Sequence, residues 1–283
     1  MAPIIRTEGL RKVYAVGKER VVALDNVDIS VEKGEFCCIV GQSGSGKSTL
    51  LNQLAGLEKP TRGKVFIGRH EISAMTENEL AAFRQAHLGF IFQSYNLLPS
   101  MTAAENVALP LMFKGMGRKE RLALAKKELK SMGLASRVNH LPTEMSGGQQ
   151  QRVGIARAFV SRPKVIFADE PTGNLDSKTS RQVLLRMLEM SKKDQITFVM
   201  VTHEPSLAAC ADRIITILDG RVQSDVVPPE EERLRRRQAL ADELAQDEAE
   251  EAAGAGQENA GSAASDAAAA AEQTTSAADA AAK

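Results

Sequence analysis

The chain has 283 residues, 43% hydrophobic and 25% charged, which is the composition of an ordinary globular protein. No apolar run approaches the roughly 18 residues that span a bilayer, and the N-terminus lacks the hydrophobic region of a signal peptide. Cys37, Cys38 and Cys210 form no CxxC pair and no even disulfide framework. We therefore expect a cytoplasmic protein whose thiols are reduced.

The last part of the chain differs in composition from the rest. Acidic and basic side chains number 36 each, but residues 229–283 carry a net charge of −8 and residues 1–228 one of +8. The first segment holds every Phe and Tyr, whereas the second is rich in Ala. We expect a folded domain over 1–228 and a mostly disordered tail over 229–283, dispensable for folding and catalysis. For Arg233–Arg237, contact with anionic lipid and a solvated helix both stay open.

Apolar residues alternate with polar ones in the first part of the domain, and this alternation predicts strands over 4–10, 21–31 and 36–40. A Gly-rich loop then opens a helix from Lys47 to about Ala55, and further strands follow over 65–67 and 88–92. From Ala103 to Ser161 the spacing is helical, with one helix over 118–132. Beyond it we expect strands over 165–168, 196–201 and 213–218 and a helix over 179–191. This order predicts an α/β domain with a largely parallel sheet and a helical insertion over about 94–162.

The Gly-rich loop matches the Walker A pattern G-x-x-x-x-G-K-[ST], and it lies between a predicted strand and a helix, as that pattern requires. Its glycines let backbone N–H groups turn inward around a phosphate, and the helix N-terminus adds partial positive charge. We expect Lys47 to reach the β- and γ-phosphates and the Ser48 hydroxyl to bind Mg²⁺. The residues of this loop are Gly41, Gln42, Ser43, Gly44, Ser45, Gly46, Lys47 and Ser48.

Two acids end the predicted strand over 165–168, which is the Walker B pattern. We assign Asp169 to Mg²⁺ and Glu170 to the attacking water as general base. His203 follows the strand over 196–201, and the expected strand order brings it beside both acids. A histidine at the end of a strand is often structural, but here it could contact the γ-phosphate or the water.

Additional motifs complete the pattern: Gln93, SGGQQ from Ser146, and Asn174 to Ser177. Together, in this order, they resemble the ATP-binding cassette (ABC) ATPases over residues 1–226. The segment MSGGQ departs from the usual LSGGQ only by Met145. The resemblance implies a P-loop NTPase fold with an N-terminal antiparallel β subdomain, a mostly parallel core sheet and a helical insertion.

The resemblance also implies roles for individual residues. Gln93 would sense Mg²⁺ and the attacking water, and Asp176 would cross a dimer interface. Tyr14 would stack on adenine, although the residues alone favour a packing role for it. The helix that starts at the SGGQQ segment would cap the γ-phosphate of ATP held by a second subunit. The implied nucleotide contacts of both segments include Thr49, Ser146, Gly147, Gly148 and Gln149.

Three longer segments resemble one subgroup of the family, the macrolide-export, lipoprotein-releasing and cell-division ABC ATPases. These segments are YAVGKERVVAL, FQSYNLLPSMTAAENVALPL and ADEPTGNLDSKTS. The resemblance implies an ATPase that binds ATP and Mg²⁺, forms a homodimer on ATP and energises a separate membrane permease. It would act at the inner face of the cell membrane and would not bind nucleic acid. The permease contact would lie near 95–100 and 103–115, although these apolar residues could equally be core.

Other functions stay open to different degrees. The main alternative is a cell-division ATPase that regulates peptidoglycan hydrolysis through a membrane partner and moves no substrate. A non-transport ABC ATPase of translation or DNA repair fits poorly, because the chain has one cassette and no coiled-coil or zinc insertion. The SGGQQ segment argues against a P-loop kinase. The sequence identifies neither the substrate nor the permease.

Overall fold

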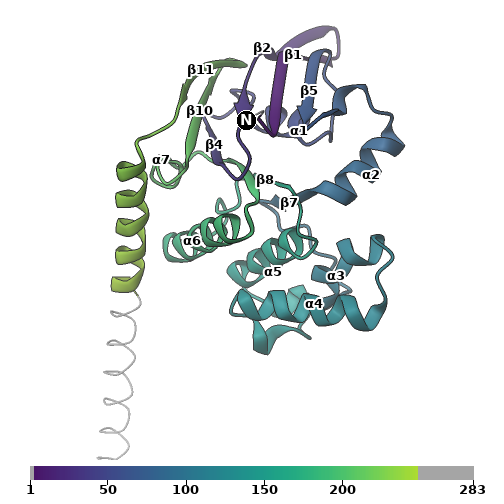
Figure 1. Ribbon diagram of the computed structural model, residues 1–283, viewed down its shortest axis with the longest axis vertical. Coiled ribbons are helices and arrows are strands. Elements are labelled where there is room, and N and C mark those ends of the chain that lie inside the picture. The colour runs from purple at the N-terminus through teal and green to yellow at the C-terminus, as the bar shows by residue number, and fades with distance from the viewer. Residues whose placement is uncertain (1–2, 248–283) are drawn as a thin grey trace, which may run out of the picture. The chain divides into compact units, whose positions relative to one another are not determined.

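The computed structural model describes residues 3–247. One compact unit extends to Arg237, and a second begins at Gln238. The first unit contains two sheets, helices beside them and a separate group of helices, drawn from purple to green in Figure 1. Within residues 3–247, no helix is long and apolar enough to cross a membrane.

The core sheet is parallel except at one edge. β4 lies at its centre between β10 and β9, and β8 and β7 continue on the far side, while β11 runs antiparallel to β10. β9 is buried along its whole length, as expected for a central parallel strand covered on both faces. In spatial order the strands are β11 (Arg221–Val226), β10 (Arg213–Leu218), β4 (Phe36–Val40), β9 (Thr197–Val201), β8 (Val165–Asp169) and β7 (Leu88–Phe92).

An antiparallel sheet forms the N-terminal subdomain. The single strand expected over 21–31 is divided in two, and both parts pair with β1. The Thr7 side chain bridges the interruption, because its hydroxyl donates to the Val27 carbonyl and accepts from the Ile29 N–H, each at 2.9 Å. The strands are β2 (Glu19–Val27), β1 (Ile5–Val16), β5 (Arg62–Ile67), β6 (His70–Glu71) and β3 (Ser30–Val31).

The helices confirm the predicted insertion. It contains α3 (Ala103–Phe113), α4 (Arg118–Ser131) and α5 (Gly147–Phe159), which pack together (Figure 1), and α5 also packs against β7 at the edge of the core sheet. The predicted helices after the phosphate loop and over 179–191 are α1 (Lys47–Leu54) and α6 (Ser177–Asp194). The short elements are α7 (Pro205–Ala208) and the 3₁₀ turns Ile72–Ala74, Ala135–Arg137 and Pro142–Glu144.

The sequence reading missed helix α2 (Glu77–His87) and strand β11. A capping box marks the start of α2: the Thr76 hydroxyl accepts from the Glu79 N–H, and the Glu79 carboxylate accepts from the Thr76 N–H at 2.7 Å. This is a recognisable start signal. β11 has polar residues along an edge, so its composition did not mark it as a strand.

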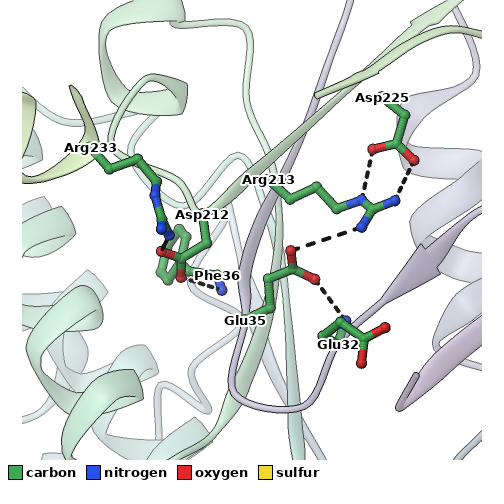
Figure 2. A network of polar contacts seen from close by, with 7 residues as sticks. All are labelled: Glu32, Glu35, Phe36, Asp212, Arg213, Asp225 and Arg233. Atoms are coloured by element: carbon green, nitrogen blue, oxygen red, sulfur yellow. Dashed lines mark hydrogen bonds and ion pairs between the residues drawn. The ribbon is translucent and has the colours of Figure 1, made fainter. Parts of the chain in front are cut away.

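The expected tail is not wholly disordered. Residues 230–247 are helical, and the remainder of the tail lies outside the described residues. Within the first unit, Asp212 accepts from Arg233, from Arg237 Nη2 at 3.0 Å and from the Phe36 N–H at 2.9 Å. Figure 2 shows Asp212 between Arg233 and the start of β4. The basic run is therefore helical, as one of the two interpretations expected, but Arg233 and Arg237 bind the folded domain instead of being fully solvated.

A chain that ends at Pro229 should consequently be less stable than the full chain. Asp212, which is 22% exposed in the full chain, would lose both guanidinium partners, and losing these charge-assisted hydrogen bonds should cost about 1–3 kcal/mol. We expect thermal unfolding to show a Tm lower by roughly 2–10 °C. A chain that ends at residue 247 keeps both pairs and is the control; equal Tm values for the two truncations would contradict this account.

Candidate active site

The phosphate loop lies at the carboxyl end of β4, and its backbone requires glycine. Gly41, Gly44 and Gly46 have φ values of 153°, 78° and 100°. A Cβ on Gly41 would lie 2.2 Å from the Ile217 carbonyl oxygen, and one on Gly46 would lie 2.5 Å from that of Ala23. The two carbonyls belong to different sheets, so both sheets contact the loop and restrict its backbone.

Lys47 starts α1 and is buried, which is unusual for a lysine. Its ammonium donates to the Gln42 carbonyl at 2.7 Å and so folds back across the loop. The Ser45 N–H donates to the same carbonyl at 3.2 Å. This arrangement holds a fixed positive charge inside a turn of backbone N–H groups, which suits a polyphosphate.

Ser48 and Asp169 meet between α1 and the end of β8. The Ser48 hydroxyl lies 3.0 Å from Asp169 Oδ1. Burial raises the pKa of the Asp169 carboxyl, the Ser48 hydrogen bond opposes that rise, Glu170 adds to it and Lys47 opposes it. A hydroxyl and a carboxylate at this distance are hard oxygen ligands of the type that Mg²⁺ prefers, so the donor set fits that ion.

Glu170 follows Asp169 and has a φ of 43°, a conformation that non-glycine residues rarely adopt. Its N–H donates to the Val201 carbonyl at 3.0 Å, so the adjacent strand β9 holds the turn. His203 Nδ1 lies 3.4 Å from Glu170 Oε2. The expected meeting of His203 with the Walker B acids is therefore present in the structure.

Gln93 reaches the same place from the end of β7. A Cβ on Gly173 would lie 2.8 Å from Gln93 Nε2 and 3.4 Å from Glu170 Oε2, so Gly173 separates two side chains that face one another. The Asn174 side chain donates to the Gln93 carbonyl at 3.1 Å. The strands β7, β8 and β9 thus bring together Gln93, the two acids and His203.

The segment after Gln93 is strained and fastened to α5. Tyr95 and Asn96 both have positive φ values, 58° and 47°. Arg157 of α5 donates to both of their carbonyls, at 2.8 Å and 2.6 Å, and burial lowers the pKa of its guanidinium. We did not assign Arg157 from the sequence, since only its partners in the folded chain distinguish it from other arginines of a helix.

Ser146 caps α5 in a capping box with Gln149, so the side chain of Gln149 folds back on its own helix. A Cβ on Gly147 would lie 2.8 Å from the Tyr95 hydroxyl, and one on Gly148 would lie 2.7 Å from Thr179 Cγ2. In the described part of the chain, this segment therefore contacts the loop after Gln93 and the start of α6. None of these contacts involves the phosphate loop of the same chain.

Asp176 has a local role that the sequence reading did not assign. It is the N-cap of α6, where its carboxylate accepts from the Thr179 N–H at 2.9 Å. That hydrogen bond is the main reason why the pKa of Asp176 is lowered.

Tyr14 of β1 lies beside α1 and the residues that follow it. Its hydroxyl donates to Glu58 Oε2 at 2.6 Å, and the ring is half-buried. Burial raises the pKa of the Tyr14 hydroxyl, the bond to Glu58 adds to that rise, and a bond with Thr49 opposes it. The ring is thus attached to the helix that starts at Lys47.

Comparison with known proteins agrees with this geometry. A family model described as ABC transporter matches residues 24–173. The chain belongs to this family. The ABC transporter ATP-binding protein YknY of Bacillus subtilis is 44% identical over 219 residues, which cover 77% of this chain and 95% of that protein. The macrolide export ATP-binding/permease protein MacB of Neisseria gonorrhoeae is 47% identical, but the match covers only 34% of it.

A solved structure extends the comparison to the fold. The ATP-binding cassette MJ0796, in a dimeric post-hydrolysis state bound to ADP and Pi, is 42% identical to this chain, with a TM-score of 0.75. The match covers 79% of this chain and 98% of that one. The chain is therefore an ABC ATPase with the P-loop NTPase fold, as the sequence predicted, and it binds and hydrolyses ATP.

The two glycines Gly44 and Gly46 allow a matched test of the loop. Gly44→Ala meets no atom within 4 Å and should cost about 1 kcal/mol through its positive φ. Gly46→Ala meets in addition the Ala23 carbonyl oxygen at 2.5 Å and should destabilise the ABC ATPase by roughly 3 kcal/mol or more. Urea unfolding of both variants measures the difference. Equal losses of unfolding free energy would show that the Ala23 carbonyl does not restrict the loop at Gly46.

Proposed function

We propose that the chain is the ATP-hydrolysing subunit of an export or mechanotransmission system and energises a separate membrane permease. One observation carries the proposal: the phosphate loop, Asp169, Glu170 and His203 converge at the carboxyl ends of β4, β8 and β9. Similarity to MacB proteins favours export over the regulation of cell division. The chain spans about a third of those MacB relatives.

Within this site, Lys47 and the loop N–H groups bind the β- and γ-phosphates. Ser48, Asp169 and the Gln93 amide would hold Mg²⁺, which when bound neutralises charge on the phosphates. Glu170 orients water and accepts its proton as the oxygen attacks the γ-phosphorus and the bond to ADP breaks. His203, 3.4 Å from Glu170, holds that carboxylate and faces the γ-phosphate.

We propose that two copies form the complete site. The capped N-terminus of α5 presents the Ser146 hydroxyl and two glycines, groups suited to the γ-phosphate of ATP in the opposite subunit. Asp176, at the nearby start of α6, would lie in the same interface. The dimeric structures of MJ0796 support this assembly.

We propose that the permease docks in a cleft of about 260 Å³ beside α3 and β7, at the inner face of the membrane. The cleft is lined by Phe90, Phe92, Pro110, Phe113 and Arg157, among others. Phe113 is 65% exposed, although it is large and apolar. An occupant of the cleft would contact Arg157, which also binds the Tyr95 and Asn96 carbonyls, and through it could act on the segment that follows Gln93.

The dimer proposal is tested by Glu170→Gln, which keeps the size of the side chain but removes the charge that takes the water proton. Turnover should fall at least about a hundredfold, while ATP binding through Lys47 and Ser48 survives. Size-exclusion chromatography with light scattering should show a monomer without nucleotide and a dimer with Mg-ATP but not with Mg-ADP.

Adding Ser146→Arg to that variant should prevent the dimer, because bulk and charge then occupy the place where the γ-phosphate docks. If the double variant still dimerises, Ser146 is not in the interface. If Glu170→Gln turns over ATP at the normal rate, the general base lies elsewhere.

The docking cleft is tested by Phe113→Asp, with Val227→Asp as the control. Val227 is 59% exposed, close to the exposure of Phe113, and it does not line the cleft. In cells that contain the permease, we expect Phe113→Asp to move the protein from the membrane fraction to the soluble fraction and Val227→Asp to leave it in place. Equal fractionation of the two variants would reject the cleft as the docking site.

A further inference from the structure

Glu58 and Lys12 form a polar cluster with Tyr14 at the junction of the antiparallel sheet and α1. Glu58 Oε2 accepts from the Tyr14 hydroxyl at 2.6 Å and lies 3.2 Å from Lys12 Nζ. Lys12 Nζ also donates to the Lys59 carbonyl at 2.8 Å. One carboxylate oxygen therefore ties two side chains of β1 to the residues that follow α1.

Lys12 covers one face of the Tyr14 ring. Its ammonium lies over the ring, 5.1 Å from the centroid, and its side chain is only 16% exposed. A cation over an aromatic face is attracted by the ring electrons. With one face covered in this way, the opposite face is the one that remains for a flat ligand.

The attachment of Tyr14 links two parts of a nucleotide site. The Thr49 side chain lies close enough to the Tyr14 hydroxyl to lower its pKa, and Thr49 lies two residues after the phosphate-loop lysine in α1. Glu58 lies beyond the other end of the same helix. The orientation of the Tyr14 ring is thus set from both ends of the helix whose N-terminus faces the phosphates.

From these contacts we infer that Glu58 is a positioning residue, which with Lys12 orients the Tyr14 ring for stacking with the nucleotide base. The inference rests on the proposed stacking role of Tyr14. Orientation matters because stacking falls off when two rings are not parallel and in contact, and a ring with a free hydroxyl can rotate about its χ angles. Glu58 acts through Tyr14 and does not touch the reacting phosphates.

Steady-state hydrolysis by the full-length Glu58→Ala variant tests the inference. We expect the KM for ATP to rise about three- to tenfold, the effect of losing one typical intramolecular hydrogen bond, with kcat within about twofold of its normal value. Inhibition by inorganic tripolyphosphate, which has no base, should keep its Ki. Glu58→Gln retains an acceptor for the Tyr14 hydroxyl and should restore most of the affinity.

Two further variants separate positioning from a general loss of structure. Tyr14→Phe removes only the hydroxyl and should raise the KM like Glu58→Ala, and the double variant should be no worse than either single one. Glu71→Ala removes an acid of the same subdomain, paired with Lys64 at 3.8 Å, and is the matched control. An equal rise in the tripolyphosphate Ki, or additive effects in the double variant, would overturn the inference.

The result for Tyr14→Ala identifies which step is wrong. If it raises the KM for ATP while Glu58→Ala does not, stacking stands and the positioning role of Glu58 is rejected. If Tyr14→Ala leaves the KM unchanged, the proposed stacking itself fails, and the positioning role fails with it. Neither outcome bears on Glu170, because Glu170→Gln tests hydrolysis separately.

Discussion

The phosphate loop depends on two carbonyl groups that leave no room for side chains. Gly41 lies against the Ile217 carbonyl of β10, and Gly46 lies against the Ala23 carbonyl of β2. Gly220 completes the junction, since its N–H donates to the Ser45 carbonyl and its own carbonyl accepts from Asp25. A motif of eight residues therefore requires both sheets to be in place before its backbone can adopt this conformation.

Part of the backbone strain lies at the candidate active site. Glu170, Tyr95 and Asn96 are three of the seven non-glycine residues with positive φ in the described chain. Such residues cost of order 1 kcal/mol or more each and persist when their surroundings hold them. The Val201 carbonyl holds Glu170, and Arg157 holds Tyr95 and Asn96. These contacts hold two strained segments, one directly after Gln93 and one beside His203.

The sequence predicted the features that local patterns encode. The phosphate loop, the acids at the end of β8 and the helix start at Ser146 are continuous segments, and each matches its predicted element. The proximity of His203 to Glu170 followed from strand order, since parallel strands align their carboxyl ends. Arg157, Glu58 and Thr7 were missed because their partners lie 61, 44 and 20 residues away, and no local pattern marks such pairs.

The contacts of Arg233 and Arg237 were also missed because their partner, Asp212, is distant in the sequence. Composition separates residues 229–283 correctly as poor in apolar groups, but Arg233 and Arg237 are held by one carboxylate rather than by a core. Asp212 also exchanges two backbone contacts with the first residue of β4: its side chain accepts from the Phe36 N–H, and its own N–H donates to the Phe36 carbonyl at 2.7 Å. The opposite end of β4 is the phosphate loop. The two arginines therefore stabilise the strand that carries the loop, so a segment with no catalytic motif still belongs to the structure that binds ATP.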